Sequence, residues 1–276
     1  MTTAENLNRI IQAKADIKQA IENKGVTLSA EAKIDEFSYA IRLIPQEISE
    51  GKWVVPNGTL FQGSNFSSFD GRMLDVSNIT NMNGLFKNCH SVTSIDVTGW
   101  NTASVTDMSN LFNTSSLLTE IKGLQGLDLS SVTTISSMFY YCSKITSIDV
   151  AGWNTGSISN MGSLFEYCSV LTEINGIENF DTKNLTDMSR LFANCSKLTS
   201  VDLSKWDLSK VTSMASSFAY CKALTEVKMG GDVSKLNSVV GMFNGITTTG
   251  KFYYNSAYDY SKIIEVLPST WTAVPM

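Results

Sequence analysis

The stretch VTDMSNLFNTSSLLTEI, residues 105–121, decides the fold because the chain repeats its pattern seven times. The landmark of each copy is a Phe, and successive copies lie 26, 27, 26, 27, 26 and 25 residues apart. A fixed period between about 20 and 50 residues is typical of a solenoid, in which similar units stack along one axis. The landmark residues are Phe86, Phe112, Phe139, Phe165, Phe192, Phe218 and Phe243.

Each unit divides into two halves with different spacing. In the first half, Val105, Met108 and Leu111–Phe112 are spaced like one face of a short helix or 3₁₀ segment. In the second half, Leu118 and Ile121 begin an L-x-x-I-x-V pattern, which is how a short leucine-rich-repeat strand presents its buried side chains. One unit buries too little alone, so neighbouring units must stack and share a core.

The repeats also alternate in composition. The strand half reads IDVTGWNT at 95–102, IDVAGWNT at 148–155 and VDLSKWDL at 201–208, whereas the units between these carry no Trp there. Trp100, Trp153 and Trp206 are therefore 53 residues apart, twice. This spacing predicts a true period of two units.

The composite pattern V-T-x-M-x-x-L-F-x-x-C-x-x-L-T-x-I-D-V-x-x-W resembles the BspA-type leucine-rich repeat of bacterial surface proteins over roughly residues 76–246. We therefore expect an α/β, leucine-rich-repeat-like solenoid of seven repeats of about 26 residues. Each repeat unit forms one layer, or rung, of such a stack. The first and last rungs need an atypical unit to cover their open core, which predicts an N-terminal cap at 46–75 and a C-terminal cap at 247–276. The tyrosines of that last segment leave an aromatic contact surface as the alternative.

Residues 1–45 have the pattern of an α-helical hairpin. Thr2-x-x-Glu5 fits a capping box, Gly25 fits a C-terminal cap, and Pro45 would end the second helix. Such short helices are unstable alone and must pack on each other, on further copies, or on a partner. We expect this segment to attach or oligomerise the chain through Leu7, Ile10, Ile17, Ile21, Ile34, Phe37, Ile41 and Ile44.

Residues 6–44 carry a second resemblance, through I-x-x-A-K-x-x-I-K-x-A-I-x-x-K-G-V followed by a second amphipathic helix. The segment is similar to a helix–KGV–helix element of bacteriophage tail-fibre and tail-associated proteins. An ordinary solubilising hairpin is the alternative. Charged residues interrupt residues 1–24, so no secretory signal is expected there. The phage resemblance implies another route outside the cell, on a virion.

Composition excludes several partners. A net charge of −5 argues against a nucleic acid held by phosphate contacts. No stretch approaches the ~18 consecutive apolar residues of a membrane span, so membrane insertion is not expected. The five cysteines each stand three residues after a repeat Phe, which predicts small buried thiols and neither disulfides nor a metal site.

Residues for catalysis are scarce. His90 is the only His, and Cys89 is adjacent to it in sequence. Neighbouring side chains point apart, so a nucleophile–base pair is not expected. Asp96, Asp149 and Asp202 recur at one strand position, which is a surface pattern and not the unique pair that a glycosidase needs. We expect no enzyme activity and no cofactor.

The exposed side of the strands is the remaining candidate site, because solenoids usually bind through such an extended face. The candidate binding residues are Thr119, Glu120, Lys122, Thr146, Ser147, Asp149, Thr172, Glu173 and Asn175, with Trp100, Trp153 and Trp206. Two alternatives stay open: a Thr ladder selected for β propensity, and tryptophans that pack in the core or turns.

These observations predict a non-enzymatic bacteriophage virion protein, a tail or fibre appendage. Its solenoid would contact a host cell-surface protein or glycan, or another virion protein, and its N-terminal helices would form a homo-oligomer. A bacterial cell-surface adhesin of the BspA kind is the alternative.

Overall fold

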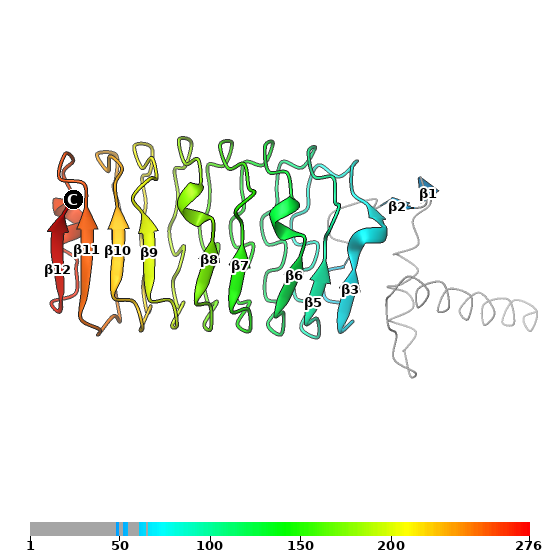
Figure 1. The fold of residues 1–276 in the computed structure, drawn as a ribbon, viewed down its shortest axis with the longest axis horizontal. Coiled ribbons are helices and arrows are strands. Elements are labelled where there is room, and N and C mark those ends of the chain that lie inside the picture. The colour runs from blue at the N-terminus through cyan, green and yellow to red at the C-terminus, as the bar shows by residue number, and fades with distance from the viewer. Residues whose placement is uncertain (1–47, 50–51, 55–60, 65) are drawn as a thin grey trace, which may run out of the picture.

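The chain forms an elongated β-solenoid. The computed structural model describes residues 48–49, 52–54, 61–64 and 66–276. In Figure 1, short strands lie side by side along the long axis of the molecule, point the same way, and reach the C-terminus at one end. The predicted repeat solenoid is therefore confirmed. The helical hairpin predicted for residues 1–45, with its eight apolar contact residues, lies outside the described residues.

The strands occupy the second half of each unit, as the L-x-x-I-x-V spacing predicts. Their hydrogen-bonded orders are β1-β2-β4, β3-β5-β6, β7-β8 and β9-β10-β11-β12, and every pair but the antiparallel β1 and β2 is parallel. The strands are β1 (Ile48–Ser49), β2 (Lys52–Val54), β3 (Ser68–Asp70), β4 (Leu74–Asp75), β5 (Ser94–Asp96), β6 (Glu120–Lys122), β7 (Ser147–Asp149), β8 (Glu173–Asn175), β9 (Ser200–Leu203), β10 (Glu226–Met229), β11 (Gly250–Tyr254) and β12 (Trp271–Pro275). The helical elements are η1 (Gly71–Met73), η2 (Leu124–Gly126), η3 (Ile177–Asn179) and α3 (Ser261–Ile264).

The strand register places equivalent residues of neighbouring rungs beside each other. Ile95 pairs with Ile121, and Ile148 pairs with Ile174, so the central apolar residue of each strand lies on that of its neighbour. Because side chains alternate between the two faces of a strand, the residues on either side of this apolar position point outward. The shared register therefore creates a core row inside and two polar rows outside.

The first half of each unit contains turns and not the predicted short helix. The N–H of Met108 donates to the Thr134 carbonyl in the next rung at 3.1 Å, whereas the N–H of Leu111 closes a turn onto the Met108 carbonyl at 3.4 Å. A helix would satisfy its N–H groups within its own turn and leave carbonyls of the neighbouring rung unpaired. Bonding between rungs therefore overrides the helical spacing. Parallel bridges run through Asn81, Asp107, Thr134, Asn160, Asp187, Ser213 and Ser238.

The repeat phenylalanines form one stacked ladder in the core. Phe86 and Phe112 stack with ring centroids 5.8 Å apart, and Phe139 and Phe165 stack at 5.7 Å with an interplanar angle of 1°. Phe61 adds a rung that the seven-copy pattern does not include, because it stacks on Phe86 at 5.1 Å. Offset ring pairs of this kind add stability beyond the area they bury.

The three repeat tryptophans lie in the core, so an exposed aromatic row is wrong and the core-packing alternative holds. Their exposed fractions are 5%, 6% and 1% for Trp100, Trp153 and Trp206. Each indole N–H donates to a carbonyl of the preceding rung at 2.7–2.9 Å: Gly71 for Trp100, Leu124 for Trp153 and Ile177 for Trp206. A buried indole needs such an acceptor.

These indole contacts explain the predicted two-unit period. The three accepting carbonyls belong to the first residues of η1, η2 and η3, so each Trp rung follows a rung that carries a 3₁₀ turn. Gly123 and Gly176 precede η2 and η3 with φ of +76° and +89°. The strand ladder is interrupted after the strands that lead into these turns, between β6 and β7 and between β8 and β9.

The cysteines are buried free thiols, as predicted. Each thiol lies in hydrogen-bonding distance of a Phe carbonyl, as for Cys168 and Phe139 at 3.1 Å. Ser115 takes the cysteine position in its rung, and its hydroxyl donates to the Phe86 carbonyl at 2.9 Å. The position therefore holds a small donor between rungs in six of the seven units, and Ile246 takes it in the last.

The C-terminal segment continues the ladder through β11 and β12. Tyr260 is buried, and its hydroxyl donates to the Gly231 carbonyl at 2.6 Å. Phe252 and Trp271 are also buried. These three aromatic side chains therefore pack inward at this end of the solenoid.

Candidate binding face on the strands

The predicted polar binding residues are all exposed on the outward side of the strands and of the turns before them. Glu120 and Lys122 extend from β6, and the central positions come from β7 and β8. Ile148 on β7 is buried between two exposed neighbours, which is the alternation that directs those neighbours outward. We refer to the outward side chains of β3 and β5–β11 as the strand face.

The threonine row beside the strand face has a structural role. The Thr119 hydroxyl donates to the Thr93 carbonyl at 2.9 Å, and the Thr172 hydroxyl donates to the Thr146 carbonyl at 3.0 Å. Each bond joins one rung to the preceding one beside a backbone N–H bond to the same carbonyl. The Thr119 and Thr172 hydroxyl protons are therefore already used inside the solenoid.

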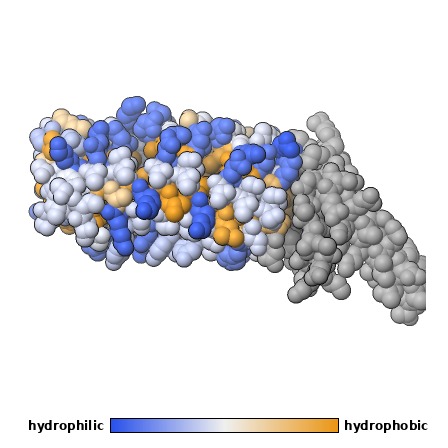
Figure 2. Space-filling view, turned by 60° about the horizontal axis from the view of Figure 1, so that its bottom comes forward, coloured by the Kyte–Doolittle hydropathy of each residue, from blue (hydrophilic) through white to orange (hydrophobic). Residues whose placement is uncertain are grey.

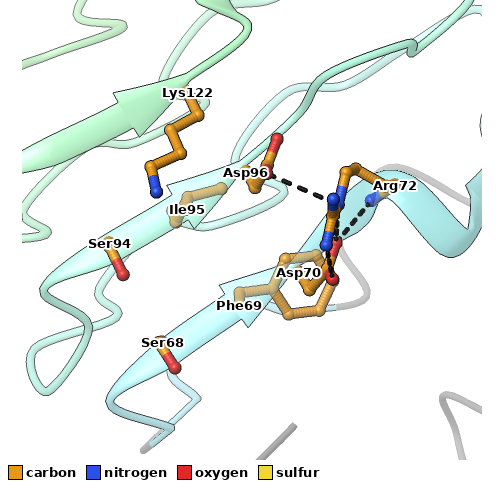
Figure 3. Close-up of a pocket in the computed structure, with 8 residues that line it drawn as sticks. All are labelled: Ser68, Phe69, Asp70, Arg72, Ser94, Ile95, Asp96 and Lys122. Carbon is orange, nitrogen blue, oxygen red and sulfur yellow. Dashed lines mark hydrogen bonds and ion pairs between the residues drawn. The ribbon is translucent and has the colours of Figure 1, made fainter. Parts of the chain in front are cut away.

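One end of the strand face holds a shallow hollow of about 150 Å³ (Figure 3). Arg72 dominates it, donating to both carboxylate oxygens of Asp70 at 2.9 and 2.6 Å. These hydrogen bonds lower the pKa of Asp70 and raise that of Arg72. The hollow is lined by Ser68, Phe69, Asp70, Arg72, Ser94, Ile95, Asp96 and Lys122.

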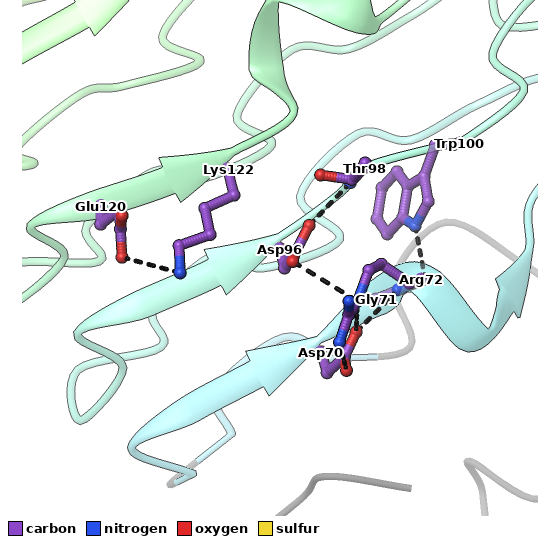
Figure 4. A network of polar contacts seen from close by, with 8 residues as sticks. All are labelled: Asp70, Gly71, Arg72, Asp96, Thr98, Trp100, Glu120 and Lys122. Atoms are coloured by element: carbon purple, nitrogen blue, oxygen red, sulfur yellow. Dashed lines mark hydrogen bonds and ion pairs between the residues drawn. The ribbon is translucent and has the colours of Figure 1, made fainter.

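Every charged side chain around this hollow lies in contact with one of opposite charge (Figure 4). Arg72 also lies 3.5 Å from the Asp96 carboxylate, which joins η1 to β5. Lys122 lies 3.7 Å from the Glu120 carboxylate on the same strand. Such exposed pairs add little stability, but they leave each of the three carboxylates at this end in contact with one of two bases.

At the opposite end of the strand face, one lysine is likewise shared between two carboxylates. Lys228 on β10 lies 3.2 Å from Glu226 and 3.9 Å from Asp202. Its ammonium also lies 5.8 Å from the Tyr253 ring centre on β11. The hydrogen bond that the Lys228 ammonium donates to Glu226, and the negative charges nearby, raise the pKa of Lys228.

The middle of the strand face lacks this compensation. Asp149 on β7 and Glu173 on β8 are exposed, and neither forms an ion pair with another residue in the described part of the chain. One Asp149 oxygen accepts the Ala151 N–H at 3.1 Å, which leaves its other oxygen available. Two carboxylates, flanked by Ser147 and Asn175, can accept hydrogen bonds or attract positive charge from a partner.

The side chains that could serve catalysis or metal binding do not come together in a site. His90 is exposed, whereas Cys89 is buried, and burial raises the pKa of its thiol to about 11. Across the segments that the structure describes, no three His, Cys, Asp or Glu side chains gather in a group that could hold a metal ion.

Three exposed tyrosines lie outside the predicted set. Tyr141, Tyr167 and Tyr220 are 43%, 37% and 48% exposed, at the corner turn that leads into a strand. Each stands two residues after its repeat Phe, so the repeat register is the signal that identifies them.

The helices of the described residues are all too short or too polar to cross a bilayer. In comparisons with curated proteins and with solved structures, nothing matches this chain. A family model described as "Mycoplasma protein of unknown function, DUF285" matches residues 57–169 and again residues 133–255. Because the two matches together span more than half of the 276 residues, the chain belongs to the DUF285 family.

Proposed function

We propose that this chain is a non-enzymatic attachment protein whose solenoid binds a partner through the strand face. The observation that carries the proposal is the charge pattern of that face, in which matched ion pairs at both ends flank the unpaired Asp149 and Glu173. Complementary charge gives a binding surface specificity and register more than raw affinity. The fixed spacing of the rungs holds these groups on a rigid scaffold before a partner arrives.

The partner of this face would present positive charge or hydrogen-bond donors to its centre. Thr146, Ser147, Asp149, Glu173 and Asn175 would form the centre of contact. Glu120 and Lys122 border this centre and form an ion pair with each other. A partner could therefore exchange that ion pair for contacts of its own. A host cell-surface protein or glycan, or a second virion protein, can supply such groups.

Two settings fit an attachment solenoid. The resemblance of residues 6–44 to phage tail-associated helices favours a virion tail or fibre appendage, with the N-terminal segment as an attachment or oligomerisation unit. The BspA-like repeat pattern favours a bacterial cell-surface adhesin as the alternative. Electron microscopy with an antibody against the repeats distinguishes them, because it labels either particles or cells. Labelling of neither would contradict the attachment role.

Charge reversal tests the binding face directly. Glu120→Lys with Glu173→Lys should weaken binding of the full chain to intact bacterial cells or to isolated virions, whichever the antibody labels. The unfolding free energy should change by about 0.5 kcal/mol or less per site, because exposed substitutions rarely do more.

The control is Glu265→Lys, which makes one such charge reversal at an exposed residue next to α3, away from the strand face. It should bind as the unmodified chain does. If the double variant also binds unchanged, the strand face is not the site.

A further inference from the structure

The corner turns between the repeat Phe and the next strand carry an aromatic and basic surface separate from the strand face. We define the aromatic corner as Tyr140, Tyr141, Tyr167 and Tyr220 with the lysines of these corner turns, Lys144, Lys197 and Lys222. The three lysines are exposed. They belong to three of the four rungs from Phe139 to Phe218, at four or five residues after the repeat Phe, so they are spread along the solenoid axis.

The tyrosine rings gather closely at the centre of this corner. The rings of Tyr141 and Tyr167, one rung apart, lie 5.4 Å from each other, and Tyr140 lies 5.8 Å from Tyr167. Tyr220 lies two rungs further on, against Gly245. Aromatic side chains with an exposed face and a polar tip are typical of recognition surfaces.

Three of these tyrosines have an unfavourable backbone conformation. Tyr141, Tyr167 and Tyr220 have φ of +59°, +63° and +59°, in the left-handed region that bulky residues rarely adopt. The same position holds Asn in two other rungs, Thr114 in a third and Gly in the last, all with positive φ, so the left-handed turn belongs to every rung. The tyrosines therefore stand at a position that every rung fixes in the same backbone conformation.

The polar groups of the corner have no partners inside the solenoid. Within the described ranges, the four tyrosine hydroxyls form no hydrogen bond and the three lysines form no ion pair, in contrast to the Tyr260 hydroxyl on Gly231. Glu166 is the single acid in these turns. The corner therefore differs in charge from the strand face and from the chain as a whole, whose net charge is −5.

We propose that the aromatic corner binds an acidic polysaccharide, with tyrosine faces stacked on sugar rings and the lysines contacting sugar carboxylates. Widely spaced lysines suit an extended polymer that carries a single charge on some of its sugars. A nucleic acid carries a charge at every residue, and an acidic chain repels such a dense polyanion. Figure 2 shows one side of the solenoid, on which hydrophobic residues form separate patches among hydrophilic ones.

Affinity electrophoresis of the full chain tests this site, with hyaluronan or unsulfated chondroitin in the gel, because only alternate sugars of these polymers carry a carboxylate. Dextran serves as a neutral polymer and poly(dT) as a nucleic acid. At least one acidic polysaccharide should retard the chain, and added salt should reduce the effect because it screens the lysines. Dextran and poly(dT) should retard it much less.

The decisive variant is Tyr141→Asn with Tyr167→Asn, which removes two rings and installs a residue that this position accepts elsewhere. The apparent affinity should fall about tenfold or more, as for the loss of aromatic stacking in other polymer-binding proteins. Thr114→Asn makes the same change at the same position of a rung without a tyrosine, and it should bind as the unmodified chain does.

Lys144→Gln with Lys197→Gln gives a second test that leaves the rings in place. It should reduce the salt dependence of retardation while thermal unfolding stays unchanged. The proposal is overturned if no acidic polysaccharide retards the chain, if either double variant is retarded as strongly as the unmodified chain, or if poly(dT) is preferred.

Discussion

At the scale of single residues, one position in six of the seven repeat units joins adjacent rungs inside the core. The cysteine position places a small donor against a Phe carbonyl, and Ser115 performs the same task in a rung without Cys. Leaving a buried carbonyl without a donor costs about 1–3 kcal/mol. The recurrence of Cys therefore follows from backbone satisfaction and small size, not from thiol chemistry.

The buried thiols predict a loss of stability in alkali. Burial raises the pKa of Cys89 from 9.0 to about 11, so the folded chain keeps the thiol proton while the unfolded chain releases it above about pH 9. The stabilisation is complete below the unfolded pKa and is lost as the pH rises through the folded one. The free energy of unfolding should fall between these two values, by up to about 3 kcal/mol from this group.

Urea unfolding of the unmodified chain and of Cys89→Ser, measured from pH 8 to 11, isolates this contribution. The serine is expected to fold because Ser115 fills the same position. The difference in unfolding free energy between the two chains should shift in favour of the variant as pH rises. A constant difference would show that the Cys89 thiol has the same pKa in the folded and unfolded states.

At the scale of elements, the 3₁₀ turns that follow β6 and β8 depend on glycine. Gly176 has φ of +89°, and a Cβ placed on it would lie 2.3 Å from the Ala151 Cα of the preceding rung. Both the backbone conformation and the close approach therefore exclude a side chain. This turn also positions the Ile177 carbonyl that accepts the Trp206 indole N–H.

Gly176→Ala should lower the free energy of unfolding by about 2 kcal/mol or more, because left-handed strain and a clash between rungs add together. Gly126→Ala is the matched control, since Gly126 ends η2 with no positive φ and no atom within 4 Å of its Cβ position. The control should change stability by about 0.5 kcal/mol or less. Chemical denaturation of both variants gives the comparison, and equal losses would contradict this explanation.

At the scale of the whole molecule, the stacked core predicts cooperative unfolding. Repeat proteins can open one unit at a time when the contacts between units are weak. Here the Phe ladder, the indole bonds and the thiol contacts all join neighbouring rungs, so opening one rung exposes the core of the next. We expect the five buried thiols to become reactive together.

Pulse alkylation in rising urea, followed by mass spectrometry, measures this. The chain should carry either no label or five labels, and full denaturation without reductant should also give five. Chains labelled only at Cys89 or Cys221, near the two ends of the cysteine row, would show that the solenoid opens from its ends.

Much of the architecture follows from the sequence alone. The 26- or 27-residue period predicts a stacked solenoid because a unit this small cannot bury its own apolar face. The period-2 pattern around Ile148 predicts which strand residues lie inside, since strand alternation is a local property. The 53-residue Trp spacing likewise predicts the pairing of rungs.

Contacts between rungs decided the rest. The spacing of Val105, Met108 and Leu111 fits a helix, but hydrogen bonds to the next rung turn this half into a second ladder. The tryptophans lie inside because a carbonyl 29 residues earlier accepts each indole N–H. Which carboxylates of the strand face are paired likewise depends on the register of neighbouring rungs. Local pattern determines what a rung buries, but only the stacked structure shows which groups of adjacent rungs meet.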